Sequence, residues 1–139
     1  MNTLQLPNHQ ATAHAQSTLE KIKKVGVGRK LSQYQKTFGS SYRRLDPHKP
    51  SPTVMRSGHR DFIHPKENRM LTVRELACLQ TFPLHWEFIG VRLESHSSKR
   101  KTNMSQFGQV GNAVPILMAE AVANEVLKQI FTNGRHKIK

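Results

Sequence analysis

Apolar residues repeat every four positions in the last third of the chain and predict an amphipathic helix over residues 113–131. The repeat consists of Met118, Val122, Val126 and Ile130, and polar side chains occupy the opposite face. A helix of this length has about five turns. Because a long exposed apolar stripe is a liability, we expect it to be covered by another protein surface.

The residues just before this helix predict a sharp turn and an open helix start. Gly111 permits a close backbone approach or a positive φ, Asn112 is a common N-cap, and Pro115 suits the first helical turn. A helix start of this kind presents unpaired N–H groups and the positive end of the helix dipole, which together can bind an anion. An ordinary capped helix is the alternative interpretation.

A second helix is predicted to begin after Thr72. The sequence TVRE that starts there is a capping box, in which the Thr72 hydroxyl accepts from the N–H of Glu75 and the Glu75 carboxylate accepts from the N–H of Thr72. Leu76 and Leu79 then share one face, and Pro83 ends the helix.

The remaining segments have weaker patterns. Residues 1–17 are polar and predict a poorly ordered arm, and residues 18–31 predict a short helix or strand with a basic cluster that is either a solvated face or a phosphate contact. Residues 34–63 alternate short β-prone pieces with turn residues, and their prolines exclude a regular central strand. Residues 84–108 are predicted to be a connector.

The charge balance favours a polyanionic ligand. The chain of 139 residues carries 22 lysines and arginines against 9 aspartates and glutamates, for a formal net charge of +13. Such an excess favours DNA or RNA over a membrane surface. One cysteine, Cys78, excludes an internal disulfide and a cysteine-based metal cluster, and no metal site is predicted. The sequence has no run of about 18 apolar residues and no secretory signal pattern, so we expect no membrane-spanning helix.

Three short segments and two longer motifs together resemble DNA (cytosine-5) methyltransferases. The segments at 42–45 (YRRL), 50–54 (PSPTV) and 64–69 (HPKENR) are similar to the target-recognition region of that family. Residues 69–83 (RMLTVRELACLQTFP) resemble its ninth motif and residues 108–115 (GQVGNAVP) resemble its tenth. The two motifs occur in the family's order, about 25 residues apart, and the resemblance covers about two-thirds of the chain.

The resemblance implies an α/β fold class in three parts. Residues 1–30 are a basic, polar arm outside the matched region. Residues 31–108 form an irregular, β-rich target-recognition lobe that includes the ninth-motif helix. Residues 109–139 hold the tenth-motif turn and the last helix, which would complete the S-adenosylmethionine-dependent, Rossmann-like methyltransferase domain of a partner.

The same resemblance assigns candidate binding residues. In the family, the turn of the tenth motif lies at the methionine carboxylate of S-adenosyl-L-methionine, which agrees with the anion site expected above. The implied cofactor contacts are Asn112, Ala113 and Val114. The recognition region binds double-stranded DNA, and a Thr-Leu-type pair contacts the backbone near the extruded base. By this resemblance, Thr53 and Val54 are the implied DNA contacts. Arg43, Arg44 and Arg56 are added as candidate DNA contacts because arginines on the loops of residues 34–63 suit grooves and phosphates, although they also suit an ordinary surface.

The residues that perform the family's chemistry are absent from this sequence. The family uses a cysteine in a Pro-Cys context to attack C6 of the flipped cytosine, a glutamate in a Glu-Asn-Val context, and an early glycine-rich cofactor motif. Cys78 lies inside the ninth-motif helix, where the family usually has arginine, and we expect it to be a small packed residue. No catalytic residue is therefore assigned to this chain.

These absences predict one subunit of a two-chain enzyme. The chain would be the small (beta) subunit of a heterodimeric DNA cytosine-5 methyltransferase from a restriction-modification system, inactive alone, with a large (alpha) subunit supplying the nucleophile. Because the chain begins at Met1 with its own arm, we expect a separate gene product in the bacterial cytoplasm. A stand-alone basic DNA-binding or regulatory protein and an inactive methyltransferase remnant are the alternatives.

Overall fold

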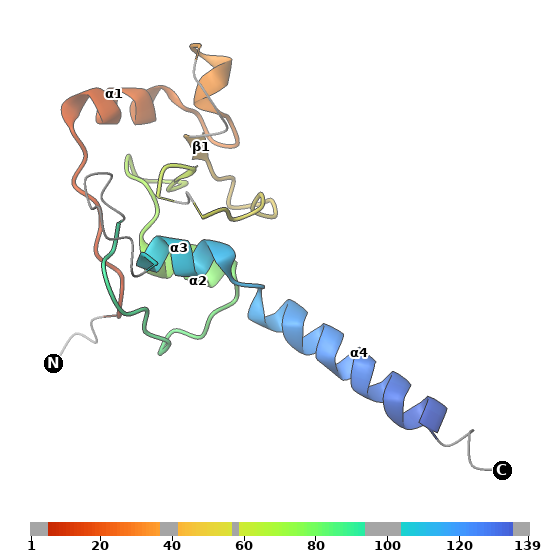
Figure 1. The fold of residues 1–139 in the computed structure, drawn as a ribbon. Coiled ribbons are helices and arrows are strands. Elements are labelled where there is room, and N and C mark those ends of the chain that lie inside the picture. Colours follow the sequence, from red (N-terminus) through yellow and green to blue (C-terminus); the bar gives the residue numbers. More distant parts are fainter. Residues whose placement is uncertain (1–5, 37–41, 57–58, 94–103, 135–139) are drawn as a thin grey trace, which may run out of the picture.

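The computed structural model describes residues 6–36, 42–56, 59–93 and 104–134, which form a mixed fold of helices and a small sheet. Helix α1 (Gln16–Lys24) is followed by the 3-10 helix η1 (Leu31–Gln33) and the strands β1 (Arg43–Arg44) and β2 (Phe62–Ile63). The helices α2 (Val73–Leu79), α3 (Gln106–Asn112) and α4 (Ile116–Gly134) complete the order. Figure 1 shows that the elements up to α3 gather in one lobe and that α4 extends away from it.

The core of the lobe lies where α2 packs beside α3 (Figure 1). Its buried side chains are Leu45, Phe62, Leu71, Val73, Leu76, Ala77, Phe88, Phe107 and Val110. The predicted capping box at the start of α2 is confirmed. Oγ1 of Thr72 accepts from the N–H of Glu75 at 3.1 Å, and the Glu75 carboxylate accepts from the N–H of Thr72 at 2.8 Å.

The sheet is small. β1 and β2 pair in parallel, and isolated antiparallel bridges join Lys30 to Arg43 and Ile63 to Met70. The lobe is irregular, as its prolines predict, but the prediction of a β-rich lobe is wrong for the described residues, because each of the two strands is only two residues long. Short extended segments, joined to one another by a few backbone hydrogen bonds, take the place of longer strands.

The N-terminal segment packs along the lobe, so the prediction of a poorly ordered arm is wrong for the described residues 6–15. The side chain of Asn8 donates to the carbonyl of Phe88 and accepts from its N–H, both at 2.9 Å. Nε2 of His14 accepts from the N–H of Met70 at 3.1 Å. Polar side chains bonded to distant backbone groups hold this segment, and a search for apolar periodicity does not detect such contacts.

The segment before α4 is itself a helix, and this corrects the predicted turn. Ser105 caps α3 by accepting from the N–H of Gly108 at 3.1 Å. Asn112 ends α3, so it is not the N-cap of the next helix. α4 begins at Ile116, and Pro115 directly precedes it. The seven residues of α3 include two glycines, whose low helix propensity hides the helix from a sequence-based prediction.

α4 leaves the lobe with its apolar side chains exposed. Leu117, Met118, Val122 and Ile130 each expose between 54% and 61% of their surface. Figure 1 shows no other described element beside this helix. The apolar stripe predicted from the sequence therefore has no cover within the described part of the chain.

By length and composition alone, the segment Gln106–Phe131 could cross a membrane, because an 18-residue stretch within it has a mean hydropathy of 1.2. This differs from the expectation of no such segment. The segment is not one continuous helix, because α3 ends at Asn112 and packs into the lobe core. Its α4 part contains Glu120 and Glu125, and carboxylates are costly inside a bilayer. These features favour a protein surface as the cover for α4.

Candidate functional site

The junction between α3 and α4 is held by the residue that follows α2. Gln80 is buried, and its Nε2 donates to the carbonyls of Val110 and Ala113 at 3.3 and 3.1 Å. Its own carbonyl accepts from the N–H of Ile116 at 3.2 Å. One side chain and one carbonyl thus fix both the end of α3 and the start of α4.

The start of α4 is not an open anion site, which corrects that prediction. The N–H of Ile116 is paired with Gln80, and the N–H of Leu117 donates to Oγ1 of Thr81 at 3.0 Å. Two of the N–H groups that a helix start normally leaves unpaired are therefore used inside the chain. A ligand at this junction would have to be bound mainly by side chains.

The residues expected to contact a cofactor form an exposed edge beside the junction. Asn112 is exposed, and Val114 exposes 59% of its surface. Ala113 is half-buried, with its carbonyl bonded to Gln80. An amide and an apolar side chain on one edge fit one wall of a site for a small amphipathic molecule whose remaining contacts come from another surface.

One loop of the lobe lies directly against α3 at Gly111. A Cβ atom on Gly111 would lie 2.4 Å from the carbonyl oxygen of Met55 and 2.6 Å from Cα of Arg56. Of the two roles predicted for Gly111, the close backbone approach is confirmed, and its φ is not positive. In the same loop Thr53 is exposed, whereas Val54 packs against the lobe core.

Two neighbouring arginines in β1 have different environments. Arg44 is 6% exposed, and its guanidinium donates at 2.7–3.0 Å to the carbonyls of Ile22, Val25, His64 and Glu67 and to Oδ1 of Asn68. The expectation that Arg44 contacts DNA is thus corrected, because its donors face inward and join α1 to the lobe. Arg43 is half-buried and has no side-chain partner among the described residues.

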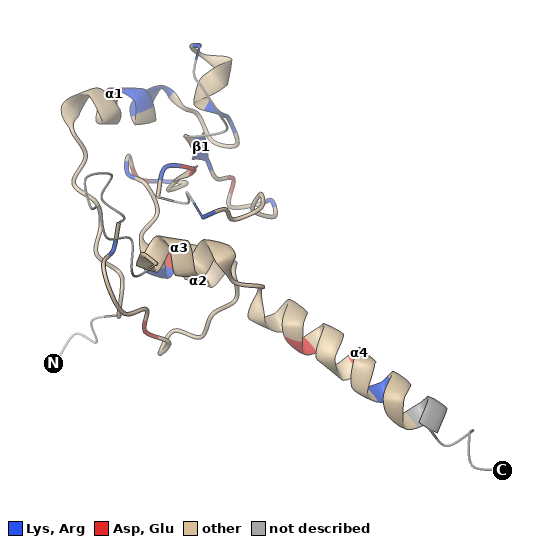
Figure 2. Cartoon of the chain, viewed as in Figure 1, with Lys and Arg blue, Asp and Glu red and all other residues tan. Residues whose placement is uncertain are grey.

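Many of the lysine and arginine positions along the ribbon lie near α1 and β1, whereas α4 has few charged positions (Figure 2). Lys21, Lys23 and Lys24 lie in the last turn of α1, where they also interact favourably with the helix dipole. All three are exposed, and Arg29, which follows them, is exposed as well. In the part of the chain that the structure describes, no carboxylate forms an ion pair with these four side chains. This surface suits a polyanion.

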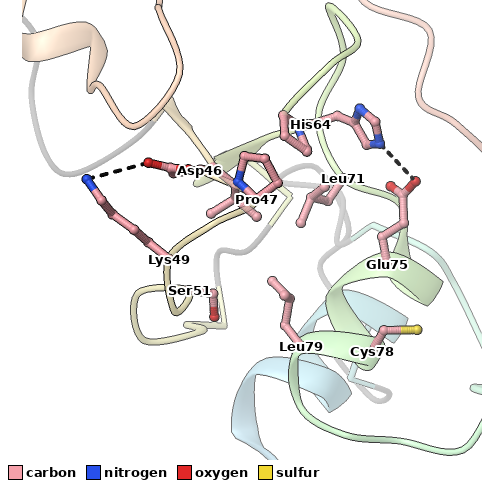
Figure 3. Close-up of a pocket in the computed structure, with 11 residues that line it drawn as sticks. Asp46, Pro47, Lys49, Ser51, His64, Leu71, Glu75, Cys78 and Leu79 are labelled. Atoms are coloured by element: carbon pink, nitrogen blue, oxygen red, sulfur yellow. Dashed lines mark ion pairs between the residues drawn. The ribbon is translucent and has the colours of Figure 1, made fainter.

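A cavity of about 330 Å³ lies between α2 and the loops that follow β1 and β2. Figure 3 shows the side chains of Leu71 and Leu79 at its apolar part and His64 beside Glu75 at its rim, with 3.9 Å between His64 Nε2 and Glu75 Oε1. Cys78 also lines the cavity, but the residue is exposed. The prediction of a packed Cys78 is therefore wrong, because this position lies on the outer face of α2.

Comparison with known proteins identifies the family. The family model described as C-5 cytosine-specific DNA methylase matches residues 1–128. The chain belongs to the C-5 cytosine-specific DNA methylase family. The match begins at residue 1, so it includes the N-terminal region that the motifs alone leave unassigned.

Individual members of the methylase family are also similar to the chain. It is 70% identical over 131 residues to type II methyltransferase M.AquIB of Picosynechococcus, with 94% of each chain covered. The motifs predict an arrangement like that of the AquI modification methylase, and this identity confirms the resemblance. The chain is 33% identical to M.DdeI of Desulfomicrobium norvegicum and 36% identical to M1.HphI of Haemophilus parahaemolyticus. It spans only 32% and 31% of those two proteins, while 86% and 87% of its own length is covered.

Several residues of this methylase chain that organise the site escape sequence reasoning. Gln80 and Thr81 follow α2 inside the ninth motif, yet their role at the α3–α4 junction depends on contacts with residues about 30 or more positions away. Arg74 has a structural role of the same kind, since it is buried and donates to the carbonyls of Pro7 and Pro83. Motif membership was the available signal for all three residues.

The ion pair that anchors α2 predicts an acid-sensitive fold. Burial raises the pKa of Glu75, but hydrogen bonds from Arg69 and Thr72, together with the Arg69 charge, lower the pKa from 4.5 to about 2. Because the folded-state pKa is the lower one, the carboxylate stabilises the fold above about pH 4.5, and this contribution is lost as the pH falls towards 2. Its size is on the order of 2 kcal/mol after solvent screening.

The matched variant for this ion pair is Glu75→Gln, which keeps the amide oxygen as a cap but cannot titrate. Unfolding monitored by circular dichroism between pH 2 and 6 should show a steeper loss of stability for the wild-type chain than for the variant. Parallel curves for the two proteins would show that Glu75 does not control the acid response.

Proposed function

We propose that this chain is the DNA-recognition subunit of a heteromeric cytosine-5 methyltransferase. In this proposal the chain supplies the target-recognition lobe and the edge of a cofactor site. A larger partner chain supplies the glycine-rich cofactor motif, the nucleophilic cysteine and the glutamate. The complex binds duplex DNA in the cytoplasm, flips a cytosine out of the helix and methylates its C5 atom.

The exposed apolar face of α4 is the observation that carries this proposal. Seven large apolar residues along α4 expose half or more of their surface: Leu117, Met118, Val122, Val126, Leu127, Ile130 and Phe131. Proteins rarely leave so many large apolar side chains of one helix uncovered. In the methylases that the chain resembles, the last helix packs on the catalytic domain, so a separate chain carrying that domain is the fitting cover.

The proposed DNA surface combines the recognition loop with the basic surface. Arg43, Thr53 and Arg56 lie on the lobe, and the lysines in the last turn of α1 add positive charge near β1, because Arg44 of β1 bonds to the end of α1. Hydroxyl and guanidinium groups suit contacts with phosphates and base edges. Val54 contributes by packing the loop against the core. Arg44 is left out of this surface because it is buried.

The exposed edge of Asn112 and Val114 fits a limited role toward S-adenosyl-L-methionine. The cofactor supplies the methyl group when it is bound. The amide of Asn112 would donate to the methionine carboxylate, and Val114 would exclude water from its apolar side. No side chain of this edge can accept or hold a proton from cytosine, so the edge positions the cofactor and leaves proton transfer to the partner.

Reconstitution tests this proposal. Transfer of tritiated methyl groups to duplex DNA is measured with this chain, with a chain carrying the Pro-Cys and glycine-rich motifs, and with their mixture. Only the mixture should label DNA, with the label on C5 of cytosine. Labelling by this chain alone, or by the other chain at the same rate without it, would contradict the proposal.

The lone cysteine gives a second prediction. In the reconstituted enzyme, Cys78→Ser should retain activity within about twofold, because surface substitutions away from a site change little. The exposed thiol should meanwhile react with an aromatic disulfide reagent in the folded chain, without prior unfolding. Loss of methyl transfer in the serine variant at normal assembly would give Cys78 a chemical role that the proposal denies it.

A further inference from the structure

Gly111 sits where two parts of the proposed enzyme meet. On its C-terminal side, the next three residues form the exposed edge assigned above to the cofactor. On its other side lies the backbone of Met55 and Arg56, in the loop that carries Thr53. The short helix α3 therefore joins the proposed cofactor edge to the proposed DNA loop.

The contact at Gly111 is made by backbone atoms, which cannot move aside independently. A Cβ atom would lie 2.4 Å from the carbonyl oxygen and 2.5 Å from the carbonyl carbon of Met55, and 2.6 Å from Cα of Arg56. Real Cβ contacts essentially never fall below about 3 Å, so any other residue at this position forces either the loop or α3 to shift. A flexible side chain could rotate away, but this stretch of backbone has to shift as a unit.

The partners of α3 decide which side moves. Phe107 and Val110 of α3 are buried in the lobe core, and Gln80 fixes the end of the helix. The side chains of Met55 and Arg56 are exposed. A substitution at Gly111 therefore pushes the loop outward while α3 keeps its place.

We propose that Gly111 is a positioning residue that seats the DNA-contacting loop on α3. The inference rests on the proposed function, since it assigns Thr53 and Arg56 to DNA. The inference adds a specific cause for the placement of the loop. Because Gly111 of the tenth motif has no side chain, the loop lies close to α3, and this sets the position of Thr53 relative to DNA. The cofactor edge, which begins one residue later, stays where Gln80 holds it.

The test uses Gly111→Ala in the reconstituted two-chain enzyme with amplified, unmethylated genomic DNA as substrate. The KM for DNA should rise about tenfold or more, because a displacement near 1 Å is enough for such a loss. The KM for S-adenosyl-L-methionine should change less than threefold. Gly26→Ala is the matched control, since its Cβ would meet no atom closer than 3.4 Å, and both KM values should stay at the wild-type level.

A double-mutant cycle with Thr53→Ala separates positioning from general damage. If Gly111→Ala acts by moving Thr53, the Thr53→Ala substitution should cost much less in the Gly111→Ala background than in the wild type. Additive effects of the two substitutions would overturn the inference. A fall of more than about 10 °C in the melting temperature of the Gly111→Ala chain would also overturn it, because Gly111 would then be needed for the core.

The cycle also distinguishes this inference from the proposed function. If Thr53→Ala alone leaves the KM for DNA unchanged, the assigned DNA surface is wrong and the inference falls with it. If Thr53→Ala raises the KM for DNA but shows no coupling to Gly111→Ala, the DNA surface stands and the positioning role of Gly111 is wrong.

Discussion

The double variant Val122→Glu/Val126→Glu is expected to weaken assembly with the catalytic chain by about 100-fold or more, because buried apolar anchors carry most of an interface's binding energy. These two side chains expose 54% and 50% of their surface in the lone chain, so placing charges there leaves the lobe intact. In the complex they would be buried, and each carboxylate would lose its hydration without a partner. Sedimentation velocity and methyl transfer at equal chain concentrations provide the measurement.

The polar face of the same helix supplies the control. Asn124→Glu/Lys128→Glu adds two carboxylates to α4 and changes the net charge by more than the test variant does, and both positions are exposed. Lys128 pairs with Glu125 at the surface, where such an interaction contributes little. This control should assemble with the catalytic chain normally. Equal loss of assembly by both double variants would show that added negative charge anywhere on α4 weakens assembly. The apolar stripe would then not be the interface.

Arg44→Ala is expected to lower the stability of the fold and Arg43→Ala to lower the affinity for DNA, although the two residues are neighbours in β1. Arg44→Ala should destabilise the chain by roughly 3 kcal/mol or more, since it removes charged donors from buried acceptors. Among those acceptors are the carbonyls of Ile22 and Val25 at the end of α1. The guanidinium therefore caps the C-terminus of α1, and its positive charge interacts favourably with the negative end of the helix dipole. Thermal unfolding of each variant chain measures the difference.

Arg43→Ala provides the matched control for the buried arginine. The free energy of unfolding of this variant should stay within about 1 kcal/mol of the wild type, because the half-buried Arg43 side chain has no partner among the described residues. Its DNA affinity should fall, with the salt dependence of binding reduced by about one phosphate contact. If Arg44→Ala is as stable as the wild type and loses only DNA binding, Arg44 contacts DNA and its buried hydrogen bonds do not stabilise the fold.

Local features of the fold could be predicted from the sequence. The capping box of Thr72 and Glu75 depends on residues three apart, and both of its hydrogen bonds are present. The apolar repeat of α4 depends on positions four apart, and that helix forms within three residues of both predicted ends. The resemblance to the methylase motifs likewise gave the family before any contact between distant segments was known.

Contacts between distant segments account for most of what the sequence could not predict. Arg43 and Arg44 are both basic residues in a β-prone stretch, and only the pairing of β1 with β2 places one of them inside. Asn112 is a common N-cap, but the α3 helix places it at a C-terminus instead. The anion site expected at the start of α4 does not form for a similar reason, because Gln80 and Thr81, which follow α2, accept from the N–H groups of Ile116 and Leu117.

Covalent trapping tests the central claim, that the nucleophile lies on a partner chain, most directly. Duplex DNA copied with 5-fluorodeoxycytidine in place of cytosine is incubated with both chains and S-adenosyl-L-methionine. Fluorine at C5 cannot leave as a proton does, so the attacking thiolate stays bonded to C6. Mass spectrometry after nuclease digestion should find the nucleotide adduct on a cysteine of the partner, with Cys78 unmodified. An adduct on Cys78, or trapping by this chain without the partner, would contradict the account.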